Sequence, residues 1–285
     1  MQRTLIRLHR GYGLGDSVQF SIVLQHLLKH RPDWQIDFVS DHPYRVLPIR
    51  AFDYDHQPPA SQYDKIIDCP MYDNTGNWTD KPNTRAVACL YERFGIPYDP
   101  ECGRYHIDHE NDHYSHKADA FYESIGCSHG ETCWNAVICH FAGKTNPAAK
   151  DLPLECRQPI LDAIRGLGYV PILLGYSTPN GGNITHLHAL ISSAAAFVGI
   201  DSGPGKVASA TATPSLICWT GHHPLRMHDP APNTVHLVPE NHAAMEPICW
   251  DAAKLRYFEK AYRMWTYPSE CLAYQVDAWL QETLA

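Results

Sequence analysis

Residues 198–210 read Val198-Gly199-Ile200-Asp201-Ser202-Gly203-Pro204-Gly205-Lys206-Val207-Ala208-Ser209-Ala210. The apolar run that ends at Ile200 predicts a buried strand, and the small residues from Val207 to Ala212 predict a helix. The glycine-rich turn between them places backbone N–H groups, nearby hydroxyls and a lysine at the positive end of a helix dipole. Such a turn is suited to bind an anion, and a phosphate is the anion that we expect. The alternative is a plain strand-to-helix turn whose glycines only relieve backbone strain.

A second glycine-rich turn, Arg10 to Ser17, follows the first expected strand of the chain. Apolar residues then recur at helical spacing up to Pro32, so Asp16 and Ser17 lie at a helix N-terminus. Asp16 has two interpretations, a cap that accepts a free N–H group or a carboxylate held as a general base. The glycines are spaced Gly-x-Gly-x-Gly rather than as the dinucleotide-binding fingerprint, which argues against a nicotinamide cofactor.

The whole chain alternates between apolar runs and helical patterns, which predicts an α/β fold with parallel sheets. The apolar runs do not alternate with polar residues, as expected where helices cover both faces of a sheet. The expected strands are Thr4–His9, Gln35–Ser40, Tyr63–Asp68, Asn135–Phe141, Val170–Leu174, Ala195–Ile200 and Leu216–Trp219. The expected helices, after the first, are Thr84–Phe94, Leu154–Leu167, Ile184–Ser193, Val207–Ala212, Asp251–Trp265 and Glu270–Leu284.

Composition narrows the classes of protein to consider. The 285 residues carry a net charge of −8, which argues against broad electrostatic binding to nucleic acid. No apolar run is long enough to span a membrane, and residues 1–8 are too short and too charged for a signal peptide. The ten cysteines include no Cys-x-x-Cys pair, so we expect reduced thiols and a cytoplasmic location.

One segment, His106 to His116, is rich in histidine. On a helix, His109, His113 and His116 would share one face, as a metal site requires. The segment lacks a second set of ligands, and a solvated linker is the interpretation that we favour.

Three motifs together resemble the heptosyltransferase-like glycosyltransferases, glycosyltransferase family 9. They are Gly13-Leu14-Gly15-Asp16, the loop Asn146 to Pro153, and the segment from His188 through Ala210. The resemblance covers most of the chain. It implies a GT-B fold of two facing Rossmann-like domains, with an acceptor-binding domain over residues 1–130, a nucleotide-sugar-binding domain over residues 131–250, and closing helices over residues 251–285 that pack back on the body.

The resemblance also implies the chemistry. Family members invert the anomeric centre, move a hexosyl or heptosyl group and need no metal or other cofactor. Asp16 matches the catalytic carboxylate, and Gly13, Leu14, Gly15 and Ser17 form the turn on the acceptor side. The residues that match the donor phosphate and nucleotide site are Lys150, Asp201, Ser202, Gly203, Pro204, Gly205, Lys206, Thr220 and Gly221.

Several points stay open at the level of sequence. Lys206 stands where the family often has histidine, and residues 176–180 lack the acidic residue that contacts the donor ribose. The nucleotide, the sugar and the oligomeric state are therefore undetermined, and the acceptor is a glycan, a lipid-linked sugar, a protein or a modified nucleic-acid base. The alternatives are a non-catalytic nucleotide-sugar-binding module, a glycosyltransferase directed to DNA or protein, and a sugar-nucleotide epimerase that would use His9, His222 or His223.

Overall fold

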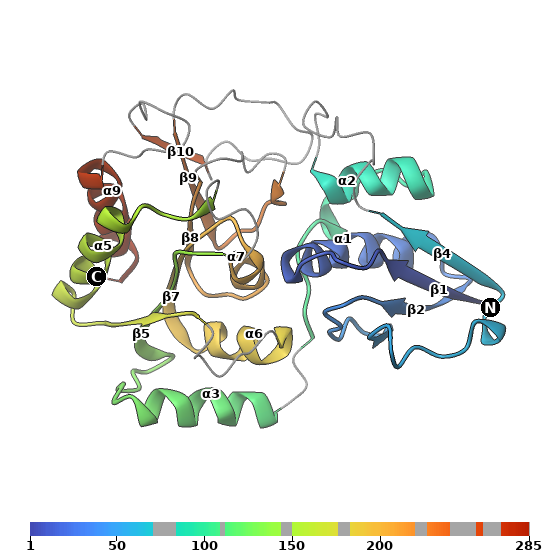
Figure 1. The fold of residues 1–285 in the computed structure, drawn as a ribbon, viewed down its shortest axis with the longest axis horizontal. Helices are drawn as coiled ribbons and strands as arrows, with labels where there is room; N and C mark the ends of the chain where they lie inside the picture. Colours follow the sequence, from blue (N-terminus) through green and yellow to red (C-terminus); the bar gives the residue numbers. More distant parts are fainter. Residues whose placement is uncertain are drawn as a thin grey trace.

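The structure, a computed structural model, describes residues 1–70, 84–108, 112–143, 150–175, 183–219, 227–239, 255–258 and 269–284. It contains two parallel sheets that lie side by side with helices around them, as the sequence predicts (Figure 1). We call the parts that carry the first and the second sheet the first half and the second half.

The first half is built on a four-stranded sheet in the order β3-β2-β1-β4, in which every pairing is parallel. Because β2 and β4 pair on opposite sides of β1, the order of the strands reverses at β1. The elements are β1 (Gln2–Leu8), α1 (Leu14–His30), β2 (Trp34–Val39), β3 (Arg50–Phe52), η1 (Ala60–Gln62), β4 (Lys65–Cys69), α2 (Arg85–Cys89), η3 (Leu90–Phe94) and η4 (Pro100–Cys102).

The second half is built on a six-stranded parallel sheet in the order β10-β9-β8-β7-β5-β6. Here the order reverses between β5 and β7. The elements are α3 (Asp112–Ser124), β5 (Trp134–His140), α5 (Leu154–Gly166), β6 (Val170–Leu173), α6 (Ile184–Ser192), β7 (Ala194–Ile200), α7 (Gly203–Ser209), β8 (Ser215–Cys218), β9 (Thr234–Pro239), β10 (Leu255–Phe258) and α9 (Ser269–Leu284).

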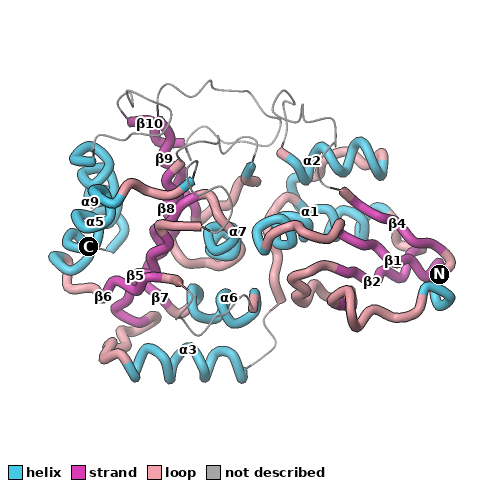
Figure 2. The backbone as a smooth tube through the Cα atoms, in the orientation of Figure 1, coloured by secondary structure: helices cyan, strands magenta, loops and turns pink. Residues whose placement is uncertain are grey.

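Helices cover both faces of the second sheet (Figure 2). Alternate residues of β5 show why the strand is apolar throughout: Val137 and Cys139 face the core shared with α5 and α9, whereas Ala136 and Ile138 face the core shared with α6 and α7. The second of these cores continues without a break into the first half, where it includes Ile6 of β1. The two sheets are therefore joined by apolar packing.

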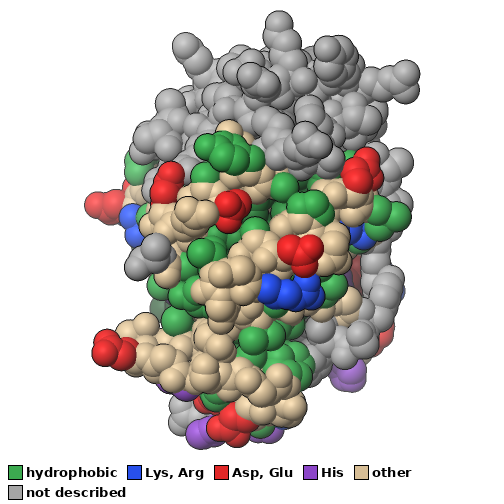
Figure 3. Space-filling view, turned by 90° about the vertical axis from the view of Figure 1, so that its left-hand side faces the viewer, with side chains coloured by type: hydrophobic (Ala, Val, Ile, Leu, Met, Phe, Trp, Pro, Cys, Tyr) green, Lys and Arg blue, Asp and Glu red, His purple; other side chains and the backbone are tan. Residues whose placement is uncertain are grey.

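The first and the last helix of the second half pack within it. Helix α9 lies against α5, as expected for a helix that packs back on the body, and α3 lies against α6. Neither these helices nor any other helix in the described residues is both long and apolar enough to cross a membrane. On the face of the second half shown in Figure 3, basic side chains are scattered singly among polar and apolar ones.

Two expectations about secondary structure are wrong. Leu255–Phe258, expected within a helix, forms β10, because its backbone pairs in parallel with β9 at the edge of the sheet. Helix α7 begins at Gly203 rather than at Val207, because Ser202 accepts the N–H of Gly205 and so caps the helix four residues earlier. Strands β3 and β9 were not among the expected strands.

The first turns of α1 and α7 meet at two glycines. A Cβ atom on Gly15 would lie 3.1 Å from the Cα of Gly203, and a Cβ atom on Gly203 would lie 3.1 Å from the amide nitrogen of Gly15 and 2.7 Å from Leu14 Cδ2. Contacts this short are tighter than nine in ten real Cβ contacts, so glycine at both positions favours the close approach of the two helices. The two glycine-rich turns of the sequence thus form one junction between the halves.

The junction predicts a stability difference between two glycine positions. Gly203→Ala forces a methyl group against the backbone of α1, so we expect the free energy of unfolding to fall by about 1–3 kcal/mol in chemical denaturation. Gly143→Ala is the control, because a Cβ atom there meets nothing within 4 Å. Equal stability of the two variants would contradict the close approach.

Candidate active site

The candidate site lies where both sheets reverse their strand order. Asp16 follows β1, His140 ends β5 and Asp201 follows β7, so all three lie beyond the carboxyl ends of strands at the two reversal points. Ligands of open parallel sheets bind at such points. The contact between α1 and α7 brings the two points together.

Asp16 is fixed from two sides. Gly13 is the N-cap residue of α1, and Asp16 is the third residue of the helix. Oδ2 of Asp16 accepts the N–H of Gly13 at 3.0 Å, so Asp16 caps the helix from within its first turn. Its Oδ1 accepts a hydrogen bond from Nη1 of Arg85 at 2.7 Å. The side chain remains 16% exposed, so this carboxylate is oriented and still reachable.

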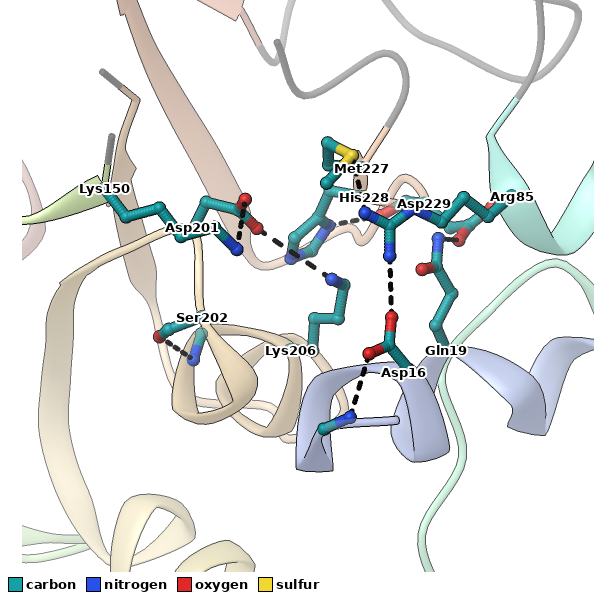
Figure 4. A network of polar contacts seen from close by, with 12 residues as sticks. Asp16, Gln19, Arg85, Lys150, Asp201, Ser202, Lys206, Met227, His228 and Asp229 are labelled. Carbon is teal, nitrogen blue, oxygen red and sulfur yellow. Dashed lines mark hydrogen bonds and ion pairs between the residues drawn. The ribbon is translucent and has the colours of Figure 1, made fainter. Parts of the chain in front are cut away.

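Asp201 gathers two lysines on the other side of the junction (Figure 4). Nζ of Lys150 lies 3.3 Å from one carboxylate oxygen, and Nζ of Lys206 lies 3.9 Å from the other. Asp201 and Lys206 are buried, whereas the Lys150 side chain is 19% exposed. Asp201 therefore holds both ammonium groups beside the first turn of α7.

The site gathers charged side chains of both signs in the described residues. The basic side chains of Arg85, Lys150 and Lys206 lie beside the carboxylates of Asp16 and Asp201, and the carboxyl group of Asp229 is buried nearby. Burial lowers the pKa of Lys206 and of Arg85 below their ordinary values, and the nearby carboxylates oppose both shifts. An added anion would relieve the repulsion among the three cations, so the site is suited to a phosphate group.

His140 adds a neutral partner to the turn. Its Nδ1 lies 3.0 Å from the hydroxyl oxygen of Ser202, and burial lowers its pKa to about 4. The imidazole is therefore neutral near pH 7 and supports the cap of α7 without adding charge.

A segment of the second half, Met227–Asp229, is inserted against the first half, and we call it the strap. Oδ2 of Asp229 accepts a hydrogen bond from Gln19 Nε2 at 2.6 Å, and its Oδ1 accepts one from the hydroxyl of Thr84. Nη2 of Arg85 lies 3.0 Å from Sδ of Met227. The strap residues are buried, so they link α1 and α2 to the second sheet through a water-excluded contact.

Most of the residues that the sequence singled out come together. Asp16, Lys150, Asp201, Ser202 and Lys206 surround the junction (Figure 4). Gly15, Gly203 and Gly205 allow the close packing, while Gly13 and Leu14 lie at the start of α1 and Pro204 lies in the first turn of α7. A Cβ atom on Gly205 would lie 3.0 Å from the carbonyl oxygen of Ile200, so this glycine lets α7 start close to β7.

Other expected residues lie elsewhere or outside the described part. Ser17 is fully buried on the core side of α1. Thr220, Gly221, His222, His223, residues 176–180 and His109 lie outside the described residues. His113 and His116 are exposed on α3, and no group of three metal-ligating side chains occurs within the described ranges.

Sequence reasoning missed Arg85, His140 and the strap. Arg85 is the second residue of an expected helix. His140 is a polar residue at the carboxyl end of an expected strand, and that position was a usable signal. Nothing local marks Met227 or Asp229, because their partners lie 142 and 210 residues away.

No protein-family model and no curated protein sequence matches the chain. Solved structures do match it. Escherichia coli ADP-heptose lipopolysaccharide heptosyltransferase II aligns over 100% of both chains with a TM-score of 0.66 and 14% identity. The iron-containing dodecameric glycosyltransferase TibC of enterotoxigenic E. coli aligns over 99% of this chain and 79% of that chain, with a TM-score of 0.62 and 16% identity.

Two further structures extend the comparison. TibC in complex with ADP-D-β-D-heptose matches with a TM-score of 0.59 and 15% identity, again over 99% of this chain and 79% of that chain. The glycosyltransferase family 9 protein of Veillonella parvula matches over 82% of this chain and 85% of that chain, with a TM-score of 0.51 and 15% identity. At these identities the likeness establishes the fold: the chain has the heptosyltransferase-like fold of glycosyltransferase family 9, as the resemblance implied.

The buried His228 predicts a pH dependence of stability. Burial lowers the pKa of His228 to about 3, so the folded protein holds it neutral while the unfolded chain binds a proton below about pH 6.5. Stability is therefore full above pH 6.5 and falls as the pH drops from there toward 3, by up to about 1.4 kcal/mol per pH unit for this group.

His228→Gln removes the titrating group. We expect the slope of the free energy of unfolding between pH 6.5 and 4.5 to become shallower, measured by urea denaturation. His113→Gln on the surface of α3 controls for the substitution at pH 7. An unchanged slope in His228→Gln would contradict a neutral buried imidazole.

Proposed function

We propose that the protein is an inverting glycosyltransferase, which moves a sugar from a nucleotide-diphospho-sugar to an acceptor hydroxyl. The observation that carries the proposal is the junction of α1 and α7, because it places an oriented carboxylate and a cluster of cations within one site. A fold shared with heptosyltransferases supports the same reaction class.

The second half would bind the donor. Lys150, Lys206 and the positive dipole end of α7 are suited to the diphosphate, whose negative charge grows as the glycosidic bond breaks. These groups can stabilise that charge without a metal ion. TibC binds ADP-D-β-D-heptose on the same fold, so an ADP-sugar is the first donor to test. In this proposal residues 131–250 form the donor domain and residues 1–130 the acceptor domain.

Asp16 would act as the general base. Inversion needs one base that takes the proton of the acceptor hydroxyl while its oxygen attacks the anomeric carbon opposite the leaving group. Asp16 faces the junction, and its two oxygens are oriented by Gly13 and Arg85, so its geometry is fixed before substrate binds.

A second candidate function is a nucleotide-sugar-binding module without catalysis. The ion pair between Asp16 and Arg85 favours it, because a carboxylate engaged by a buried guanidinium can serve structure alone. The two functions differ in turnover: a transferase consumes the donor in a reaction that depends on Asp16, whereas a binding module consumes none.

Asp16→Asn tests the base. With ADP-, GDP-, UDP- and CMP-sugars and a panel of acceptors, we expect nucleotide release from one donor by the wild type and a kcat lower by roughly 10²–10⁴-fold in the variant, the contribution typical of a general base. Nucleotide affinity should be retained. Asp162→Asn, on the exposed surface of α5, is the matched control. Equal turnover by Asp16→Asn and the wild type would refute the assignment.

Lys150→Ala tests the phosphate contact. Loss of one charge-assisted hydrogen bond of about 1.5–3 kcal/mol should weaken nucleoside diphosphate binding roughly 10- to 100-fold in calorimetry. Binding of the nucleoside without phosphates should change little. Lys117→Ala supplies the control, since Lys117 is exposed on α3, a helix that contributes no residue to the junction. A variant that binds diphosphate as tightly as the wild type would place the donor elsewhere.

A further inference from the structure

Arg85 is a buried cation with partners from both halves. Its side chain is 9% exposed, Nη1 lies 2.7 Å from Asp16 Oδ1, and Nη2 lies 3.0 Å from Sδ of Met227. Figure 4 shows the guanidinium between the carboxylate on α1 and the strap. A planar guanidinium that contacts two groups at once has little freedom to rotate, so it fixes the carboxylate that it contacts.

The strap in turn holds the start of α2. Thr84, the residue before Arg85, caps α2 by accepting the N–H of Val87, and its hydroxyl donates to Asp229. Asp229 also accepts from Gln19, one turn along α1 from Asp16. The strap therefore fixes both the helix that carries Arg85 and the helix that carries Asp16.

We infer that Arg85 is a positioning residue for Asp16, and that the strap Met227–Asp229 of the second half holds Arg85 in place. The inference rests on the proposed function. The half that binds the donor would thereby set the orientation of the base in the half that binds the acceptor. Arg85 itself need not touch either substrate.

Lysine at position 85 keeps the charge but cannot contact Asp16 and Met227 together, because its ammonium group is a single point. In Arg85→Lys we expect kcat to fall at least about tenfold, while the dissociation constant of the nucleoside diphosphate stays within about twofold of the wild type. Arg93→Lys is the matched control, an exposed arginine that follows on the same helical segment.

A double-mutant comparison separates positioning from a structural role. If Arg85 acts through Asp16, Arg85→Lys should not lower the residual turnover of Asp16→Asn any further, since residues that act as a unit are non-additive. Long single-turnover incubations make that residual rate measurable.

Met227→Leu is a second variant that preserves volume and should fold. It removes the sulfur beside Nη2, so we expect a loss of about threefold in kcat that also disappears in the Asp16→Asn background. Thermal unfolding of each variant verifies that the loss does not come from unfolding.

The outcomes separate the two proposals. Additive losses in the Asp16→Asn background, or nucleotide binding weakened as much as kcat in Arg85→Lys, would overturn the positioning role and leave the transferase assignment standing. A wild type that turns over no donor with any acceptor would overturn both. The inference is supported if Arg85→Lys lowers kcat when Asp16 is present, leaves the residual kcat of Asp16→Asn unchanged, and keeps the affinity for the nucleotide.

Discussion

The structure depends on the close approach of two helix N-termini. Gly15 of α1 and Gly203 of α7 approach so closely that a Cβ atom on either would lie 3.1 Å from the backbone of the other, and this contact joins the reversal points of two separate parallel sheets. Each helix directs the positive end of its dipole toward the junction. Two like ends held together attract negative charge, so the packing itself favours an anion at this point.

The charged side chains follow from that arrangement. Three cations and two carboxylates occupy a largely buried space, where each charge needs a nearby opposite charge to offset desolvation. Asp201 stabilises the two lysines of the second half, and Asp16 stabilises the arginine of the first half. A bound diphosphate would place further negative charge beside the three cations, and that is the physical basis for the proposed donor site.

The sequence predicts those features of the fold and the site that depend on contiguous residues. The strand before Asp201 and the glycine turns at Asp16 and Asp201 are contiguous patterns, and the structure has them where the patterns indicate. The helix expected over Asp251–Trp265 was wrong at Leu255–Phe258, because a short apolar run fits a strand as well as a helix and the neighbouring strand decides between them.

The rest could not be read from the sequence because it depends on distant segments. Arg85 meets Asp16 across 69 residues and Met227 across 142, and Asp229 meets Gln19 across 210. None of these pairs has a fixed spacing or a local signature. The glycine turns predicted two helix starts, of which the one at Asp201 was expected to bind an anion, but only the fold shows that the two starts meet.

The most direct test of a single site at the α1–α7 junction is a crystal structure with bound ADP. The account predicts that the diphosphate lies against the first turn of α7, within hydrogen-bonding distance of Lys150, with the Asp16 carboxylate facing the position that the sugar would occupy. A diphosphate bound away from the junction, with Lys150 still paired only to Asp201, would contradict it.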